Sequence, residues 1–503
     1  MRRSGIAGVV GAGLAIGVGE LLAGLFEAVA SPLAAVGGFV VAHSPSWVED
    51  FAIGLFGTAD KGALAIGTVV IALVVGWFVG RAAEKRFWVA AAAFGGFGVL
   101  GTLAALGEPL TEPVPVVAAS MVALAAGLGG LWVLLRAAVP VEGDPTDGLP
   151  EDGGRRRFLG VAAAGGALAL GAGVLGRRLI ASLPSVPDIE LQPPLEAAEP
   201  PVPGSSLAVA GITPIVVPNA DFYRIDTALV VPNVDEADWT LRITGAVDRE
   251  LEFTYADLRA RPLVEDYVTI SCVSNEVGGH LVGNALWTGV RLVDLLAEAG
   301  VRTEGTQVVG RSIDGWTAGF PTELAYDGRE PLVAIAMNGE VLPRRHGFPA
   351  RLIVPGLYGY VSATKWLTEI HLTGWGDFDG YWVPRGWAKE GPIKTQSRVD
   401  VPRDGSDVAA GRLDVAGVAW APTRGIERVE VSLDDGPWQG AELSSPLSAR
   451  AWVQWRTGLT VSAGPHTVRV RATDGGGETQ TAEIAPPRPD GATGYHTVRF
   501  TAA

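Results

Sequence analysis

The chain has 503 residues, 48% of them hydrophobic and 18% charged, and a formal net charge of −15. This length exceeds what one hydrophobic core can organise and predicts roughly two to four domains. The acidic balance argues against a nucleic-acid-binding protein, which needs a basic face. Cys272 is the single cysteine, which excludes an intrachain disulfide, a CxxC redox pair, a covalently attached haem and a four-cysteine cluster.

The apolar residues are concentrated in the first part of the chain, in runs long enough to cross a bilayer as helices. A shorter apolar segment at residues 33–42 follows Pro32 and is predicted to be re-entrant or to extend the first hairpin. Several glycines of the first run lack the preceding strand and the spacing of a dinucleotide-binding loop, so they indicate close helix packing. We predict membrane-spanning helices over residues 5–29, 62–80, 87–107, 113–135 and 158–176.

Basic residues lie in alternate loops of this region and predict its orientation. They precede the first helix, separate the second from the third, follow the fourth and precede the fifth, whereas the other loops hold Lys61, Glu108 and Glu112. By the positive-inside rule the N-terminus is cytoplasmic, and the chain beyond about residue 180 is outside. Arg177 and Arg178 lie on the wrong side of the last helix for this orientation. We therefore predict a multi-pass protein of the cell membrane, embedded in the lipid bilayer, with its catalytic domain on the extracytoplasmic side.

Three further features of the membrane part bear on export and redox chemistry. The sequence RRRFL at residues 155–159 resembles the twin-arginine signal, which addresses proteins that fold before they cross the membrane; a plain basic anchor is the alternative. His43 is the only histidine in this part, so a haem with two axial histidines is not expected there. Glu20 and Glu27 predict either a proton or quinone role or an interfacial pair that faces neighbouring helices.

After the membrane domain, residues 1–180, the chain divides into a linker and two predicted domains. Residues 181–206 are rich in proline and acidic residues and predict a stiff spacer. Residues 207–398 alternate short β-type runs with one helix at 291–299, which is typical of an α+β domain that wraps a large ligand. Residues 399–503 predict an immunoglobulin-like β-sandwich without the disulfide. Its strands are expected at 413–419, 426–433, 466–472, 480–484 and 496–501.

Cys272 follows an apolar, β-type run and precedes a Gly-Gly loop. A thiol where a buried strand ends is a metal ligand, a nucleophile or a small buried side chain. As a nucleophile it would define a membrane-anchored cysteine hydrolase with His280 or His346 as the base. As a merely buried side chain it would be compatible with a non-catalytic binding protein. The residue by itself leaves these three readings open.

Short motifs spread over the middle domain resemble, in kind and order, the sulfite oxidase family of molybdopterin-dependent oxidoreductases, in the form of a membrane-anchored bacterial member. The resemblance implies an α+β molybdopterin-binding domain, a C-terminal immunoglobulin-like dimerisation domain, and hence a homodimer. It also implies a molybdenum-molybdopterin cofactor. The motifs are FYR at 222–224, the Cys272 loop, WTGV at 287–290, MNG at 337–339, HGFPAR at 346–351, VPG at 354–356 and KW at 365–366.

The resemblance also implies roles for individual residues. Cys272 would be the thiolate ligand of molybdenum, and Arg224 would reach toward the metal pocket. His346, Arg351 and Lys365 would contact the pterin and its phosphate, which needs charge-assisted donors. Within the sequence GYWVPRGW, Tyr381 is expected to line the substrate mouth as a catalytic residue, with domain-interface packing as the alternative. Further cofactor contacts are expected from Tyr223, Asn275, Ser362 and Thr364.

One departure from the family bears on the substrate. Sulfite oxidases follow the cysteine with basic residues that hold the sulfite dianion, whereas this chain has Val273 and Glu276 there. A dianion without such a cation is left unpaired. We therefore expect oxygen-atom transfer on a small or sulfur-containing substrate, with sulfite oxidation proper as the alternative. Electrons are expected to pass to or from a separate partner, a cytochrome or a quinol-linked protein, because the chain supplies no haem or iron–sulfur ligand set of its own.

Overall fold

The computed structural model describes residues 2–45, 48, 51, 55–56, 60–138, 152–182 and 186–503. The chain forms two compact units. The helical unit contains Met1–Ser185 together with Ala228–Asn233, and the outer unit contains Val186–Thr227 together with Val234–Ala503. Each of the two is a separate body of contacts and is described by itself below.

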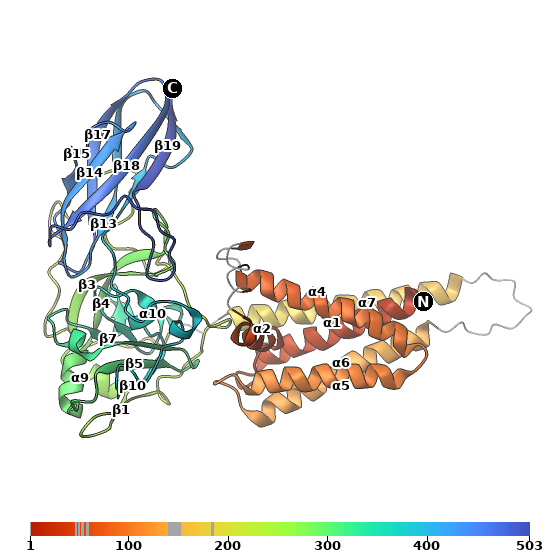
Figure 1. The fold of residues 1–503 in the computed structure, drawn as a ribbon. Helices are drawn as coiled ribbons and strands as arrows, with labels where there is room; N and C mark the ends of the chain where they lie inside the picture. The colour runs from red at the N-terminus through yellow and green to blue at the C-terminus, as the bar shows by residue number, and fades with distance from the viewer. Residues whose placement is uncertain are drawn as a thin grey trace, which may run out of the picture. The chain divides into compact units, whose positions relative to one another are not determined.

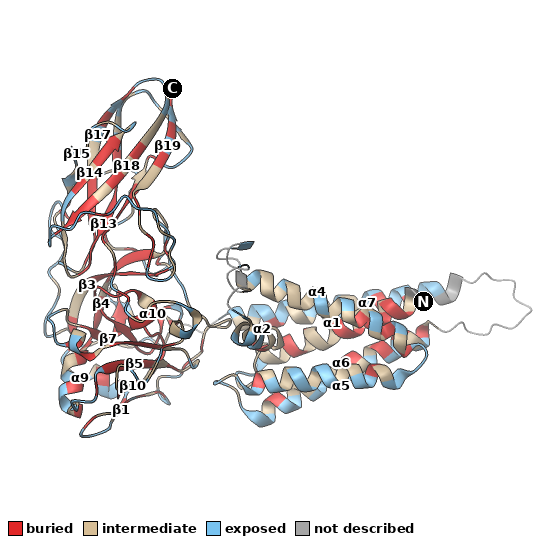
Figure 2. Cartoon of the chain, in the orientation of Figure 1, coloured by how far each residue is buried: buried red, intermediate tan, exposed pale blue. Residues whose placement is uncertain are grey.

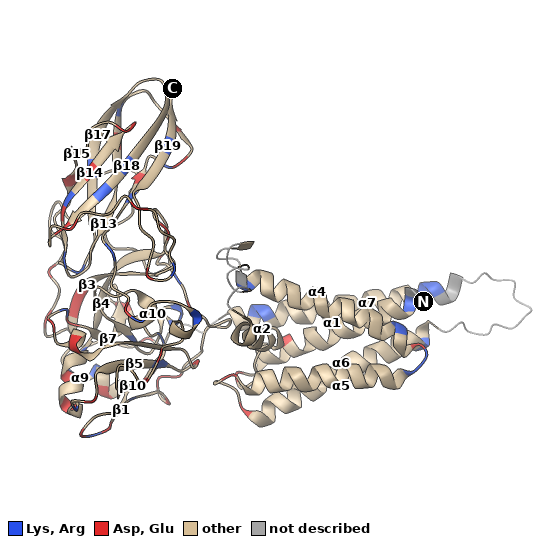
Figure 3. Cartoon of the chain, viewed as in Figure 1, with Lys and Arg blue, Asp and Glu red and all other residues tan. Residues whose placement is uncertain are grey.

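The helical unit is built from the apolar runs of the sequence. Each predicted span corresponds to one helix, although the first helix ends at Leu25, four residues before the predicted end, and the third ends at Leu106, one residue before it. Five helices of the described residues are long and apolar enough to cross a membrane. Figure 3 shows these helices almost free of charge along their lengths, with the charged side chains toward their ends. The helices are α1 (Arg2–Leu25), α2 (Pro32–His43), α4 (Asp60–Ala83), α5 (Phe87–Leu106), α6 (Pro113–Ala137) and α7 (Asp152–Ala181).

Helix α1 packs closely against its neighbours through glycine. A Cβ atom on Gly8 would overlap the carbonyl oxygen of Gly76 in α4. On α7, a Cβ on Gly176 would overlap the backbone carbonyl of Glu20 in the same way. Backbones approach this closely only where side chains are absent. These contacts support the helix-packing interpretation of the glycines in the first apolar run.

Both acidic residues of the first apolar run have partners inside the helical unit. The buried Glu20 accepts hydrogen bonds from Ser31 Oγ at 2.7 Å and from Leu33 N at 3.0 Å, so it helps to satisfy the free N–H groups at the start of α2. Arg177 Nη1 lies 3.8 Å from Glu20 Oε2. Glu27 Oε1 accepts a hydrogen bond from Asn233 Nδ2 at 2.6 Å. These contacts support the interpretation of both acids as packing residues.

The middle of the outer unit consists of two sheets (Figure 1). The first has the strand order β2-β1-β10-β5-β6 and the second β3-β4-β7-β8, with β9 paired to β7. The helix after β4, α9 (Leu292–Ala299), ends at Gly300 in the left-handed conformation. The strands are β1 (Thr240–Gly245), β2 (Leu251–Thr254), β3 (Val264–Ser271), β4 (Val282–Arg291), β5 (Gln307–Ser312), β6 (Thr317–Pro321), β7 (Leu332–Met337), β8 (Glu340–Val341), β9 (Arg351–Ile353) and β10 (Leu367–Thr373). The short helices are α8 (Tyr255–Arg259) and α10 (Gly359–Ser362).

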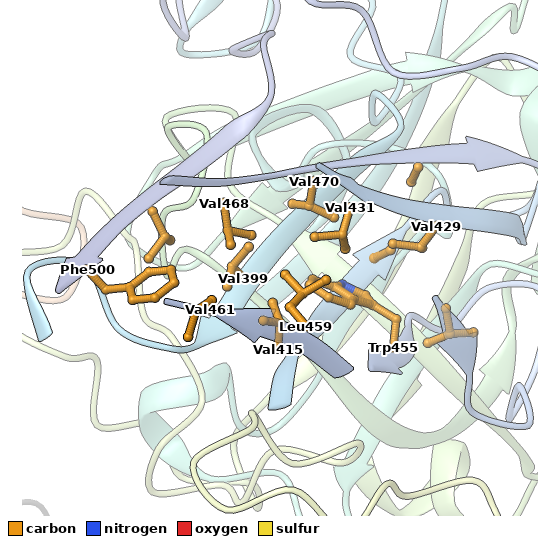
Figure 4. Close-up of a cluster of buried hydrophobic side chains, with 14 of the residues drawn as sticks. Val399, Val415, Val429, Val431, Trp455, Leu459, Val461, Val468, Val470 and Phe500 are labelled. Carbon is orange, nitrogen blue, oxygen red and sulfur yellow. The ribbon is translucent and has the colours of Figure 1, made fainter. Parts of the chain in front are cut away.

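The C-terminal part of the outer unit is a sandwich of two sheets. Their facing surfaces bury Val415, Trp455 and Leu459 from one sheet against Val431 and Val470 from the other (Figures 2 and 4). Alternating strands present one face to such a core. One sheet contains β11 (Gln396–Val401), β13 (Gly411–Trp420), β17 (Val453–Val461) and β16 (Glu442–Leu443). The other contains β12 (Ser406–Val408), β19 (His496–Ala502), β18 (Gly464–Asp474), β14 (Ile426–Leu433) and β15 (Gln439–Gly440).

One predicted strand of the sandwich is wrong, and the longest of the strands that were missed is β17. Residues 480–484 do not form a strand, although they alternate in polarity. Gln480 instead uses its side chain, which accepts from Ser397 Oγ at 2.7 Å and donates to the Gly494 carbonyl at 2.6 Å. This side chain ties the segment down without a ladder of backbone hydrogen bonds. Strand β17 occupies the place between β13 and β16.

The segment before the middle domain runs along the outer unit and is fixed to it at several points. Leu195 N donates to the Leu263 carbonyl at 2.7 Å, beside the start of β3. Further on, the carbonyl of Ile215 accepts from Trp452 Nε1 at 2.7 Å and from Asn284 Nδ2 at 2.8 Å. Residues 186–227 are therefore a strap that contacts both the middle domain and the C-terminal sandwich.

Candidate functional site

Cys272 lies directly after β3 and is buried. The backbone N–H of Cys272 donates to the Leu281 carbonyl at 2.9 Å, and the Cys272 carbonyl accepts from Asn275 N at 3.1 Å. The loop therefore folds back onto the strand. Burial raises the pKa of the thiol, and the hydrogen bonds from the backbone and side chain of Ser274 oppose that shift only in part. A free thiol in these surroundings stays protonated and is a poor nucleophile, which argues against the cysteine hydrolase.

The end of the strap brings aromatic and charged side chains to the cysteine. Phe222 packs edge-on against Trp287 and against His346, with ring centroids 5.8 Å apart in both pairs. The next residue, Tyr223, has its pKa raised by burial first and then by nearby Cys272, while Arg351 opposes the shift. Tyr223 therefore lies within electrostatic reach of both Cys272 and Arg351.

The segment from His346 to Arg351 packs directly on Lys365. Gly347 makes this possible, because it has a positive φ of 115° and a Cβ atom there would lie 3.0 Å from Lys365 Cβ. Arg351 Nη1 donates to the His346 carbonyl at 3.0 Å, and its guanidinium lies 5.0 Å from the centroid of the Trp287 ring. The structure thus brings together His346, Arg351 and Lys365, which are distributed over 20 residues of sequence.

Lys365 is held by an acid that the sequence analysis did not single out. Lys365 Nζ donates to Asp226 Oδ2 at 2.8 Å, and both side chains are buried. Arg224 Nε lies 3.7 Å from the same oxygen, and the Arg224 side chain is 41% exposed. Burial lowers the pKa of Lys365 to about 8 although Asp226 opposes this, and the positive charges of Arg351 and Arg224 lower it further. The site is thus strongly cationic within a protein of net negative charge.

His346 is neutral in this structure. Burial lowers its pKa to about 4, with the hydrogen bond to Asn219 opposing and the neighbouring cations adding to the shift. Its Nε2 lies 2.9 Å from the Asn219 carbonyl oxygen, which can only accept, so Nε2 carries the proton. Nδ1 therefore keeps its lone pair and is an acceptor. A ring system that carries N–H donors, such as a pterin, is complementary to it.

Two buried polar groups of the site lack a partner. In the part of the chain that the structure describes, Arg351 Nε and Thr364 Oγ1 are buried and have no hydrogen-bond partner. Burial lowers the pKa of Arg351 to about 10, with Tyr223 opposing. A buried cation and a buried hydroxyl with unused donors are costly unless a ligand completes them. Together with Lys365 they fit an anionic, phosphate-bearing ligand.

Two predicted cofactor residues have their polar groups occupied by the chain itself. Ser362 Oγ donates to the Tyr358 carbonyl at 3.0 Å, inside the turn formed by α10. Asn275 Oδ1 accepts from Leu281 N at 2.8 Å and closes the Cys272 loop. A cofactor contact from Ser362 or Asn275 remains a prediction, and it would use the remaining hydroxyl lone pair or the amide NH₂ group.

Tyr381 belongs to an aromatic and basic cluster whose contacts extend to the C-terminal sandwich. Arg385 lies over the Tyr381 ring at 3.8 Å from its centroid and donates to the Tyr381 carbonyl at 2.8 Å. Arg488 of the C-terminal part donates in turn to the Arg385 carbonyl. Trp387 connects the cluster to Tyr360 of α10, with ring centroids 5.9 Å apart. These contacts favour the domain-interface alternative, and the substrate-mouth role stays a prediction.

Sequence reasoning missed Asp226 and Asn219, both on the strap. Asp226 stands two positions after Arg224, and the two side chains pair. That spacing is the signal that could have found it. Asn219 acts through its backbone carbonyl, which any residue type would supply, so no pattern of side chains could have indicated it.

Two segments of the chain match models of known protein families. Residues 228–382 match the model of the oxidoreductase molybdopterin-binding domain, and residues 389–486 match that of the Mo-co oxidoreductase dimerisation domain. Sulfite oxidase of Gallus gallus is 32% identical over 324 residues, which are 54% of this chain and 69% of that protein. The chain belongs to the sulfite oxidase family of molybdopterin oxidoreductases. It is a molybdenum-dependent enzyme, and its cofactor is molybdenum-molybdopterin.

Two other relatives show how far the similarity extends. Mitochondrial sulfite oxidase of Homo sapiens is 32% identical over 321 residues. The match covers 54% of this chain and 58% of the length of that relative. The solved structure of the sulfane dehydrogenase SoxCD from Paracoccus pantotrophus aligns with a TM-score of 0.50 and 25% identity, over 59% of this chain and 84% of that one. The similarity therefore includes both the middle domain and the C-terminal sandwich.

Proposed function

We propose that the protein is a membrane-anchored, outward-facing molybdenum enzyme that transfers an oxygen atom to or from a small, sulfur-containing substrate. The observation that carries the proposal is that Tyr223 lies close to both Cys272, the single thiol of the chain, and the buried Arg351, whose Nε has no partner in the chain. When bound, the cofactor supplies the two-electron redox chemistry of oxygen-atom transfer. The chain supplies binding, orientation and the electrostatic surroundings.

The pocket residues have separate tasks in this proposal. Cys272 would supply the thiolate ligand of molybdenum, and the bound metal would favour the ionised form of the thiol. Arg351 and Thr364 would donate to the cofactor's phosphate, and His346 would accept from the pterin through Nδ1. Tyr223 and Arg224, at the end of the strap, would face the approaching substrate. Asp226 keeps Lys365 charged at neutral pH by pairing with it.

The charge of the site favours a neutral substrate. Three cations, Arg224, Arg351 and Lys365, face one acid, Asp226. A cofactor phosphate brings about two negative charges, so the loaded site has little positive charge left for an anion. Val273 is buried and Glu276 is exposed, so the loop after the cysteine adds no cation. Sulfite oxidation is the second candidate, because the similar proteins of Homo sapiens and Gallus gallus are named sulfite oxidases.

The remaining features of the proposal concern location and partners. The helices of residues 1–180 anchor the protein in the bilayer, residues 181–206 link them to the catalytic domain at 207–398, and residues 399–503 form an immunoglobulin-like domain through which two chains pair. Two observations support a separate electron-transfer partner, a cytochrome or a quinol-linked protein. The chain's motifs include no redox centre beyond molybdenum, and the chain is similar to the sulfane dehydrogenase SoxCD. Arg155, Arg156 and Arg157 are exposed at the start of α7, where an export signal can be read.

Metal analysis tests the cofactor assignment directly. Purified full-length protein from a host that makes molybdopterin is expected to hold about one molybdenum atom per chain. Cys272→Ser is expected to keep the fold and the pterin but to lower kcat by at least about a thousandfold, since the thiolate ligand is lost. Ser462→Ala, at an exposed serine of the C-terminal sandwich, is the control and is expected to keep its activity. Full turnover by Cys272→Ser would place the metal ligand elsewhere.

A comparison of substrates separates the two candidate functions. The enzyme is assayed with reduced and oxidised dyes against methionine sulfoxide and dimethyl sulfoxide, which are neutral at sulfur, and against sulfite. We expect turnover of the sulfoxides that changes little with ionic strength. Rapid oxidation of sulfite with a KM that rises steeply with salt would show that the pocket recruits an anion, and would replace the first candidate by the second.

Export is tested by the double variant Arg155→Lys, Arg156→Lys. The charge is unchanged, so a plain basic anchor would still place the catalytic domain outside. The twin-arginine proposal predicts that protease added to intact cells no longer reaches the catalytic domain of this variant. Arg177→Lys, at the other end of the same helix, is the matched control. Unchanged protease access in the double variant would leave only the basic anchor.

A further inference from the structure

The loop that carries Cys272 is held by the C-terminal sandwich, a domain matched as a dimerisation domain. We propose that Arg398 of β11 is a positioning residue for the Cys272 thiolate, and that the sandwich thereby sets the geometry of the metal ligand in addition to any pairing of chains. The inference rests on Cys272 as the ligand, but not on the identity of the substrate. It is carried by contacts on both sides of the cysteine.

The strand before the cysteine is bound along its edge by the sandwich. Thr269 N donates to the Arg450 carbonyl at 3.0 Å, and Thr269 Oγ1 accepts from Trp452 N at 2.8 Å. Two residues earlier, the Tyr267 carbonyl accepts from Ser448 Oγ at 2.7 Å. Because these partners lie in the segment that leads into β17, the approach to Cys272 is fixed by the C-terminal part of the chain.

The loop after the cysteine is bound by Arg398. Its Nη1 donates to the Gly279 carbonyl at 2.8 Å, its Nη2 donates to Thr213 Oγ1 of the strap at 2.8 Å, and its Nε donates to Asp400 Oδ1 at 2.7 Å. The side chain is only 4% exposed. Three donors of one rigid plane thus join the loop, the strap and the sandwich, and a lysine has no matching set of donors.

His496 of β19 closes the same side of the loop. A Cβ atom on Gly278 would overlap the His496 ring, and Gly278 has a positive φ of 81°. The ring is itself fixed, because its Nδ1 accepts from Val399 N at 2.9 Å. The loop therefore lies directly against the sandwich at Gly278 and is hydrogen-bonded to it at Gly279.

A short chain of bonds transmits this restraint to the cysteine. Gly279 N donates to the Glu276 carbonyl at 2.8 Å, and Asn275 N donates to the Cys272 carbonyl at 3.1 Å. Asn275 Oδ1 closes the loop by accepting from Leu281 N. Arg398 does not touch the metal position itself, so its effect on Cys272 is one of orientation. A misplacement of a ligand by a fraction of an ångström is enough to change a metal site.

The test uses the full chain without cofactor, because Cys272 is its single cysteine and alkylation by iodoacetamide reports on that loop alone. Arg398→Lys is expected to keep the thermal unfolding temperature close to that of the unchanged protein and to alkylate about tenfold faster, since the loop opens more often. Arg398→Ala is expected to alkylate faster still. Arg412→Ala, an exposed arginine of the same sandwich, is the control and is expected to leave the rate unchanged.

The enzyme with bound cofactor provides a second measurement, which a change in stability alone would not alter. The Mo(V) electron paramagnetic resonance spectrum of Arg398→Lys is expected to show shifted g-values, because the sulfur orientation differs, while Arg412→Ala keeps the spectrum of the unchanged protein. Should Arg398→Ala fail to fold, Thr213→Ala removes one acceptor of the same guanidinium and decides the question. Unchanged alkylation rates in both Arg398→Lys and Thr213→Ala would overturn the proposal. A failure of the molybdenum assignment itself would appear instead as an absence of molybdenum from the unchanged purified protein.

Discussion

Two of the buried arginines of the outer unit, Arg351 at the proposed cofactor site and Arg398 beside the Cys272 loop, differ in one respect. All three kinds of donor nitrogen of Arg398 have partners within the chain. Arg351 has an unpaired Nε beside an unpaired Thr364 hydroxyl, among the residues that the structure describes. A buried donor without a partner costs free energy that a fold tolerates where a ligand completes it. The comparison distinguishes an arginine with an unused donor, as expected of the proposed cofactor contact, from an arginine whose donors are all paired within the chain.

The largest effect is expected where the two arginines are replaced by the same apolar residue. Arg351→Met removes an uncompensated buried charge, so the cofactor-free protein is expected to become more stable by about 1–4 kcal/mol. The same change is expected to weaken cofactor retention by about a hundredfold, because two charge-assisted contacts are lost. Arg398→Met should do the opposite and destabilise the cofactor-free protein by about 3 kcal/mol. Thermal unfolding with and without cofactor measures both, and equal signs in the two variants would remove the distinction.

A smaller effect is expected from the acid that balances the pocket. Asp226→Asn leaves Lys365 without its ion pair and is expected to lower the free energy of unfolding by about 2 kcal/mol, moderated because Lys365 can release its proton. Asp379→Asn is a matched control, since Asp379 Oδ1 also lies 2.8 Å from a lysine, Lys389 Nζ, but is 52% exposed. Exposed pairs contribute less than about 1 kcal/mol. A similar decrease in the free energy of unfolding in the two variants would show that burial of the Asp226 pair does not affect stability.

The smallest expected effect concerns how the free energy of unfolding depends on pH through His496. Burial lowers the pKa of His496 to about 4, and the neighbouring Arg398 adds to the shift. Between about pH 6.5 and 4, His496 is protonated in the unfolded state but stays neutral in the folded state. The free energy of unfolding therefore falls as the pH falls through this range. Between pH 7 and 5.5 this amounts to about 1 kcal/mol.

His496→Gln is expected to flatten this acid limb of the unfolding curve. His466 is the control with the opposite sign, because its hydrogen bond to Asp434 raises its pKa, and its contribution is therefore lost as the pH rises. His466→Gln should not flatten the acid limb and should instead make it steeper, because the charged form of His466 stabilises the fold as the pH falls. An acid limb of unchanged slope in His496→Gln would show that the ring does not stay neutral in the fold.

Much of the site could be predicted because its residues are tied to local backbone features. Cys272 ends a β-type run, and Gly347 precedes a turn, so their motifs carry their own structural context. Ser362 and Asn275 show the limit of that reasoning, since the same residue types also serve turns. Whether a hydroxyl or amide faces a ligand or its own backbone depends on the rotamer and the neighbouring chain, which spacing does not reveal.

The sequence by itself determined the elements whose pattern is local. The apolar runs became helices α1 and α4 to α7 because length and hydropathy suffice to make them, and the single thiol already identified the centre of the site. Only the tertiary structure decided which buried charges are satisfied. Asp226 pairs with Lys365 across 139 positions, and Arg398 reaches Gly279 across 119. Such pairings depend on where distant segments meet in the fold, and no periodicity along the chain records them.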